Sequence, residues 1–155
     1  MIIMPRLIPI IVHFGLALVP RLYGNHPKIP LIEKDIRRFM SGYRGEVTTD
    51  FHSQFLDDKN HSIFRGLRLL NGHHHFQIDT AILSRKYLLL LETKNNSGDL
   101  HIDQEQFSQT SSYGEKGYKH PIIQVNEHRD KLHAWLKSHH LHHSPRRPQP
   151  PICTH

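Results

Sequence analysis

Four consecutive leucines at residues 88–91, followed at once by Glu92 and Lys94, constrain the fold of this chain more than any other feature. An apolar run bounded by turn residues is typical of a strand that is covered on both faces. We therefore predict a strand over residues 87–94. This strand carries a carboxylate and an ammonium group into a region that should be buried, where a charge without a partner is costly.

Two further strands are predicted directly upstream, over residues 62–70 and 75–83. The Asn-Gly pair at 71–72 is a strong signal for a β-hairpin turn between them. Residues 84–86 allow a second tight turn. The three strands therefore form an antiparallel meander, and residues 100–102 are expected to add one more short strand.

Helices are predicted on both sides of the meander. Apolar residues recur at helical spacing from residue 31 to about 56. Gly42 and Gly45 are expected to break this segment in two, which places Glu46 in the first turn of the second helix. Another helix is predicted over residues 121–138, because a proline opens it and apolar residues follow at helical spacing.

The order of elements indicates the fold class. Residues 103–120 are polar and are expected to form a loop. Helix, three strands, loop and helix then give an α/β (α+β) fold, in which helices flank a small mixed sheet with an antiparallel meander.

The composition fits one globular domain with a basic surface. The 155 residues include 20 Lys and Arg against 14 Asp and Glu, which gives a formal net charge of +6. This balance favours an anionic partner, nucleic acid first and an acidic membrane surface second. Cys153 is the one cysteine of the sequence, so an internal disulfide and a zinc site built on thiolates are both excluded.

The N-terminus carries an apolar run at residues 7–19, preceded by Arg6. This pattern resembles the start of a secretory signal. The run is shorter than the roughly 20 residues that a membrane-spanning helix needs, and Pro9 and His13 interrupt it. We expect a strand or helix packed on the domain, or a loose leader, with no stable membrane insertion and a cytoplasmic location. Residues 20–30, with three prolines, are typical of a connector.

The polar residues of the meander form the candidate site. A two-residue turn before Tyr87 places Asp79 opposite Glu92 and Gln77 opposite Lys94, all on one face of the hairpin. A register slip of one residue would turn Asp79 to the other face. Two carboxylates about 5 Å apart repel each other unless a cation or a proton intervenes.

Oxygen ligands favour Mg²⁺ or Mn²⁺ over zinc. Such an ion polarises a phosphate oxygen and acidifies water, and Lys94 could orient that water or neutralise developing charge. The alternative is a cross-strand ion pair on a solvated face, which the Glu-x-Lys spacing alone also allows.

Four segments of the sequence together resemble a known family. They are Gly42 to Glu46, Phe76 to Asp79, Leu91 to Asn95 with Gly98, and His120 to Gln124. In order and spacing they are similar to the nuclease-related domain (NERD) family, which is placed in the PD-(D/E)xK nuclease superfamily. The resemblance covers about residues 36–137. The leader also resembles the N-terminal extension of Gram-positive bacterial members, notably at residues 25–28 and 30–33.

The resemblance implies a restriction-endonuclease-like core and Mg²⁺-dependent (or Mn²⁺-dependent) hydrolysis of DNA. Asp79 and Glu92 would be metal ligands, and Glu46 would reach the metal directly or through water. Lys94 would be the catalytic lysine. Gln124 would point from the last helix towards the site, where it could hold a phosphate or the attacking water.

Composition and the resemblance together predict a division of the chain. We expect a leader and connector over 1–35, the nuclease-like domain over 36–137, and a disordered tail rich in histidine and proline over 138–155. Family members usually continue with further strands where this tail begins, so we expect a truncated or frame-shifted C-terminus that exposes a sheet edge.

Two other functions stay open at this point. One is a DNA-binding module that keeps the nuclease-like fold without catalysis, which the loss of the C-terminal strands would favour. The other is a membrane-associated protein of unrelated purpose, which the apolar leader would favour.

Overall fold

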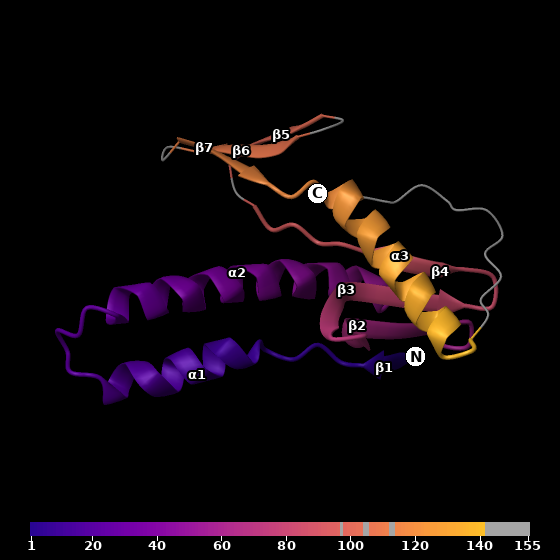
Figure 1. Cartoon of the computed structure of the whole chain (residues 1–155), viewed down its shortest axis with the longest axis horizontal. Helices are drawn as coiled ribbons and strands as arrows, with labels where there is room; N and C mark the ends of the chain where they lie inside the picture. Colours follow the sequence, from indigo (N-terminus) through magenta and orange to yellow (C-terminus); the bar gives the residue numbers. More distant parts are fainter. Residues whose placement is uncertain (97, 104–105, 112–113, 142–155) are drawn as a thin grey trace.

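The computed structural model describes residues 1–96, 98–103, 106–111 and 114–141. It is a mixed α+β structure, as the sequence predicts (Figure 1). Its elements in chain order are β1 (Ile2–Met4), α1 (Ile10–Leu18), the short 3-10 helix η1 (Val19–Arg21), α2 (Ile29–Ser53), β2 (His61–Asn71), β3 (His74–Ser84), β4 (Leu88–Leu91), β5 (Asp99–Ile102), β6 (Phe107–Ser111), β7 (Gly114–Tyr118) and α3 (Pro121–Ser138).

The main sheet has the strand order β1-β2-β3-β4. β1 runs parallel to β2, and the other neighbours are antiparallel, so the predicted meander is the centre of a mixed sheet. Helix α3 contacts β2, β3 and β4. Strands β2 and β3 and helix α3 have nearly the predicted boundaries.

A second sheet has the strand order β5-β6-β7. β5 confirms the short strand expected at residues 100–102, whereas β6 and β7 show that the loop predicted over residues 103–120 was wrong. Phe107 pairs with Tyr118 at one end of the β6–β7 hairpin, and Ser111 pairs with Gly114 at the other. The prediction failed because β7 is exposed along most of its length and therefore lacks apolar alternation. Phe107 is the buried residue that packs against the Tyr118 ring.

The register predicted for β3 and β4 is confirmed as far as these strands pair. Leu83 pairs with Leu88, and the ladder continues to Thr80 opposite Leu91. The strand ends there, however, so the predicted strand over 87–94 was too long. Glu92 and Lys94 follow the strand, in a segment without regular secondary structure.

Helix α2 is continuous through Gly42 and Gly45, so the predicted break was wrong. Position 45 has no room for a side chain, because the helix passes close to the segment after β4. A Cβ atom at Gly45 would lie 2.4 Å from Cβ of Asn95, whereas one at Gly42 would meet nothing within 4 Å. Glu46 consequently lies deep inside a long helix.

The N-terminal segment is part of this structure. β1 extends the main sheet, and α1 packs on α2 with Val12 and Gly15 buried. The boundary expected after residue 35 would fall inside α2. Among the described residues, no helix has the length and apolar character needed to cross a membrane.

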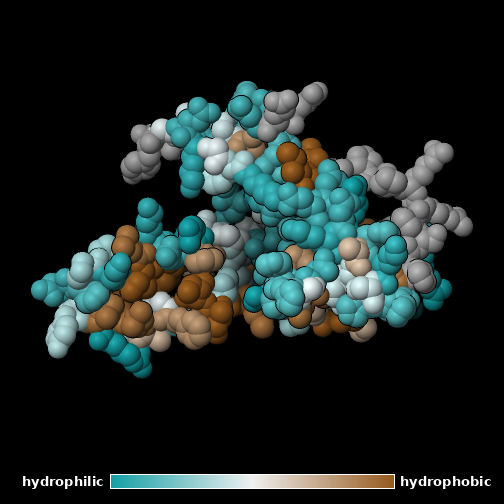
Figure 2. All heavy atoms as spheres, in the orientation of Figure 1, coloured by the Kyte–Doolittle hydropathy of each residue, from teal (hydrophilic) through white to brown (hydrophobic). Residues whose placement is uncertain are grey.

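The outer side of α1 is apolar and exposed (Figure 2). Its exposed side chains are Ile10, Ile11, Phe14, Leu16 and Leu18. The predicted tail lies outside the described residues from residue 142 onward.

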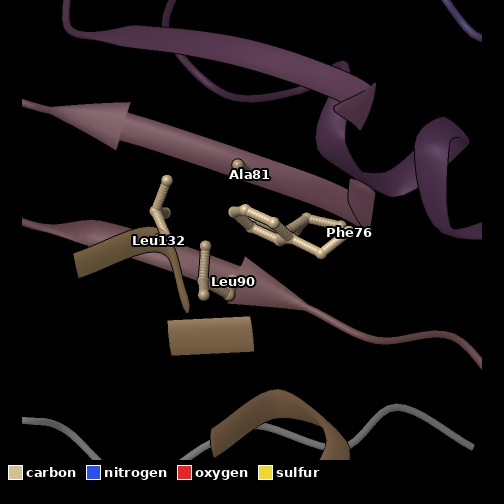
Figure 3. Packing of buried hydrophobic residues seen from close by; sticks show 5 residues of the cluster. Phe76, Ala81, Leu90 and Leu132 are labelled. Atoms are coloured by element: carbon tan, nitrogen blue, oxygen red, sulfur yellow. The ribbon is translucent and has the colours of Figure 1, made fainter. Parts of the chain in front are cut away.

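The core lies between α3 and the main sheet (Figure 3). Its buried members are Phe76, Ile78, Ala81, Leu90 and Leu132. Ile78 and Ala81 are an odd number of residues apart, so a regular strand would turn them to opposite faces. The change occurs between the pairs Arg65–Thr80 and Leu67–Ile78, where β2 has Gly66 with a φ of 65° that few other residues adopt. The first candidate ligand therefore lies at an irregular point of β3.

Candidate active site

Asp79 turns its carboxylate towards the segment that follows β4. Its Oδ2 accepts a hydrogen bond from the backbone N–H of Thr93 at 2.9 Å. This contact takes the place of further strand pairing and keeps residues 92–94 beside β3. The Thr93 hydroxyl also bonds to the hydroxyl of Thr49 at 3.1 Å, which ties the segment to α2.

Glu92, Lys94 and Gln124 form one hydrogen-bonded group. Lys94 Nζ donates to Glu92 Oε1 and to Gln124 Oε1, both at 2.7 Å. The Gln124 amide nitrogen donates back to Glu92 Oε1. Helix α3 thus brings Gln124 to the pair that follows β4. Gln77, expected opposite Lys94, is instead exposed on β3.

The second oxygen of Glu92 has a different environment. Oε2 is buried and, among the described residues, accepts no hydrogen bond. Nδ1 of His128 approaches it at 3.6 Å. His128 lies four residues after Gln124 on α3, so one helical turn brings both towards Glu92. The sequence analysis missed His128, although this spacing was visible in the sequence.

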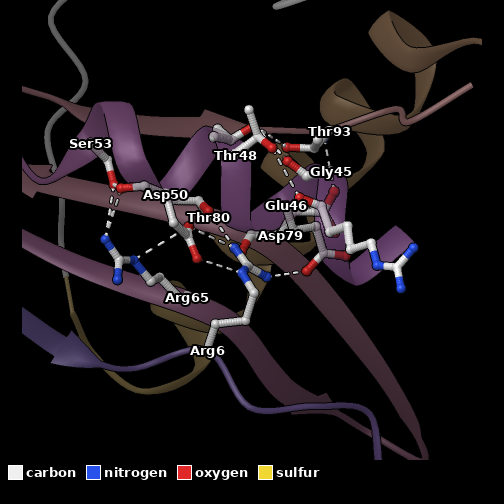
Figure 4. Close-up of polar contacts among 12 residues, drawn as sticks. Arg6, Gly45, Glu46, Thr48, Asp50, Ser53, Arg65, Asp79, Thr80 and Thr93 are labelled. Carbon is white, nitrogen blue, oxygen red and sulfur yellow. Dashed lines mark hydrogen bonds and ion pairs between the residues drawn. The ribbon is translucent and has the colours of Figure 1, made fainter. Parts of the chain in front are cut away.

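Glu46 contacts Arg6, a residue that the sequence analysis had not placed in the site (Figure 4). The Arg6 guanidinium also donates to both carboxylate oxygens of Asp50, at 2.6 and 3.0 Å. Two more hydrogen bonds, each 2.9 Å, reach the backbone oxygen of Asp79 and the hydroxyl of Thr80. One buried cation therefore joins the N-terminal segment, α2 and β3.

Asp50, the acid one turn after Glu46, has a second cation. Nε of Arg65 lies 3.3 Å from Asp50 Oδ1. A terminal nitrogen of Arg65 donates to the backbone oxygen of Asp50 and to the hydroxyl of Ser53. Asp50 is buried and shared by two arginines, which makes it a structural acid that joins α2 to the sheet.

The chain is similar to one known protein family. The family described as nuclease-related domain, NERD, matches residues 41–153, which is most of the chain. The chain belongs to the nuclease-related domain family. No curated protein and no solved structure matches it. The matched range contains all five residues expected in the site, namely Glu46, Asp79, Glu92, Lys94 and Gln124, while Arg6 lies outside it.

Burial raises the pKa of the three acids expected in the site, Glu46, Asp79 and Glu92. The pKa of Glu92 rises to about 7 through burial and then through the charge of Asp79. The pKa of Glu46 rises to about 7 for the same two reasons. The pKa of Asp79 is also raised, by burial, and burial lowers the pKa of His128. The site therefore carries negative charges that the protein stabilises poorly, which is the electrostatic condition for binding a cation.

The donor set fits a hard divalent ion at two carboxylates. Asp79 and Glu92 interact electrostatically, and Glu92 Oε2 is buried without a hydrogen-bond donor among the described residues. Mg²⁺ is commonly held by one or two carboxylates, with water and phosphate completing its shell. The described residues hold no group of three or more His, Cys, Asp or Glu side chains arranged around one ion. The third expected ligand, Glu46, is paired with Arg6 instead.

Proposed function

We propose that this nuclease-related protein hydrolyses phosphodiester bonds in DNA with the help of Mg²⁺ or Mn²⁺. The observation that carries the proposal is the group around Glu92: a buried carboxylate next to Asp79, with Lys94 held between Glu92 and Gln124. Two crowded carboxylates can hold a divalent ion, and a lysine fixed beside them can stabilise charge that develops during phosphodiester cleavage.

The side chains of the chain have separate roles in this proposal. Asp79 and Glu92 would hold the cation, which polarises a phosphate oxygen and acidifies water when bound. Lys94 would neutralise the charge that develops on the phosphorus oxygens or orient the attacking water. Gln124 would fix the position of Lys94, or hold a phosphate or the attacking water. Glu46 would reach the ion directly or through water. The working compartment would be the cytoplasm, where a lone cysteine stays reduced.

The test is cleavage of supercoiled and linear DNA by purified protein with Mg²⁺, Mn²⁺ or EDTA. We expect metal-dependent nicking or degradation, and Lys94→Ala should lower the rate by at least about 100-fold. Lys131→Ala is the matched control, because Lys131 is an exposed lysine that also faces a glutamate. Full activity of Lys94→Ala would reject the role given to Lys94.

A second candidate is a DNA-binding module that does not cleave. The exposed arginines of α2, Arg37, Arg38 and Arg44, and the net charge of +6 favour it, because they suit phosphate contacts without requiring a reaction. Binding that weakens steeply with salt, together with intact DNA in every metal buffer, would support this candidate over the first.

A further inference from the structure

All three guanidinium nitrogens of Arg6 donate hydrogen bonds. It contacts Glu46, both oxygens of Asp50, the backbone oxygen of Asp79 and the hydroxyl of Thr80. Its side chain is only 5% exposed. A guanidinium carries its charge at every accessible pH. Arg6 is therefore a permanent positive charge fixed among the acids of the site (Figure 4).

The two acids that Arg6 contacts on α2 differ in their other partners. Asp50 keeps Arg65 as a second cation. Among the described residues, Glu46 forms an ion pair with Arg6 alone. Removing the charge of Arg6 would leave Asp50 with a partner. It would leave Glu46 as a half-buried carboxylate beside Asp79, whose charge already raises the pKa of Glu46.

We propose that Arg6 competes with the divalent cation for Glu46, so that the metal site has two carboxylates while Arg6 holds Glu46 and three when Glu46 is released. The inference rests on the proposed metal site at Asp79 and Glu92. Arg6 is a positioning residue here, because it acts through Glu46.

The physical reason for this competition is electrostatic. A fixed cation beside a metal site repels the incoming ion and neutralises a potential ligand. Strand β1, a few residues before Arg6, pairs with β2 and so tethers Arg6 to the domain. The effective concentration of the guanidinium near Glu46 is therefore independent of the protein concentration. Both effects weaken metal binding, and both disappear when the charge at position 6 is removed.

The experiment is a Mn²⁺ titration followed by the electron paramagnetic resonance signal of the free ion, which needs no catalysis. Arg6→Gln should bind Mn²⁺ roughly tenfold more tightly than the unchanged protein. Arg6→Lys keeps the charge and should stay within about twofold. Arg65→Gln is the matched control: it removes the other cation from Asp50 but not from Glu46, and it should also stay within about twofold.

The gain must depend on Glu46. Adding Glu46→Gln to Arg6→Gln should return the affinity to about that of the unchanged protein. An Arg6→Gln variant with unaltered affinity, or a gain that survives in the double variant, would overturn the inference. If Arg6→Gln does not fold, the fallback is the double variant Arg6→Gln with Asp50→Asn, because a neutral residue at position 50 no longer needs a buried cation. The Mn²⁺ affinity of this double variant is then compared with that of Asp50→Asn alone.

The outcomes separate this inference from the proposed function. Mn²⁺ binding that is lost in Glu92→Gln but unchanged in Arg6→Gln would overturn the role of Arg6 and leave the metal site standing. If neither the unchanged protein nor Arg6→Gln binds Mn²⁺, the metal site and the competition fail together.

Discussion

Glu92 is a buried acid of the site whose pKa is strongly raised. Its side chain is only 4% exposed, and one of its oxygens has no hydrogen-bond donor among the described residues. Burial and the charge of Asp79 raise its pKa from 4.5 to about 7. Between these two values the folded protein binds more protons than the unfolded chain, so this group stabilises the fold below about pH 4.5 and loses that contribution as pH rises towards 7.

We therefore predict that Glu92→Gln changes the pH dependence of stability in the absence of divalent cations. The free energy of unfolding of the unchanged protein should fall relative to that of the variant by about 2 kcal/mol between pH 5 and pH 7. Urea denaturation in EDTA across this range measures the difference. Parallel curves for the two proteins would show that Glu92 does not titrate in this way.

Among the elements, α2 shows how two glycines in one helix can have opposite roles. A glycine in a helix interior costs roughly 1 kcal/mol relative to alanine unless the space requires it. Gly42 faces open space, whereas Gly45 lies against Asn95, whose side-chain amide donates to the backbone oxygen of Ser41 at 2.6 Å. The contact between α2 and the segment after β4 is therefore possible only with glycine at position 45.

We predict opposite effects for the two alanine substitutions. Gly42→Ala should stabilise the protein by about 0.5–1 kcal/mol, because only helix propensity changes. Gly45→Ala should destabilise it by about 1–3 kcal/mol, because the new methyl group must displace Asn95. Urea denaturation of both variants gives the comparison. A stabilising Gly45→Ala would mean that α2 does not approach Asn95 this closely.

On the scale of the whole molecule, the N-terminal segment folds with the rest of the domain. β1 lies in the main sheet, Arg6 reaches the candidate site, and α1 packs against α2. The α1–α2 contact is close at Gly15, where a Cβ atom would lie 2.7 Å from Ile36. A segment bound at three places should unfold together with the domain rather than separately.

The prediction compares two residues of α1. Val12→Ala should lower the free energy of unfolding of the whole protein by about 1–2.5 kcal/mol, because Val12 is buried. Phe14→Gln should change it by less than about 0.5 kcal/mol, because Phe14 is exposed. Denaturation followed by both circular dichroism and Trp135 fluorescence should show one transition. An unchanged midpoint in Val12→Ala would mean that α1 does not contribute to the cooperative fold.

The sequence by itself determined the parts of this protein that depend on local pattern. Alternation and turn residues predicted the meander and the register of β3 with β4, and helical spacing predicted α3. The motifs predicted the family, and they placed Asp79, Glu92 and Lys94 near one another because hairpin neighbours are close in the chain.

The tertiary structure alone decided the contacts that join distant segments. Arg6 and Asp79 are 73 residues apart, and an arginine ahead of an apolar run gives no sign of which acid it will meet. The close approach of α2 at Gly45 likewise involves Asn95, which is distant in sequence. Hydrophobic periodicity reports which face of an element is buried, whereas the partner of a buried charge is fixed only when the whole chain has packed.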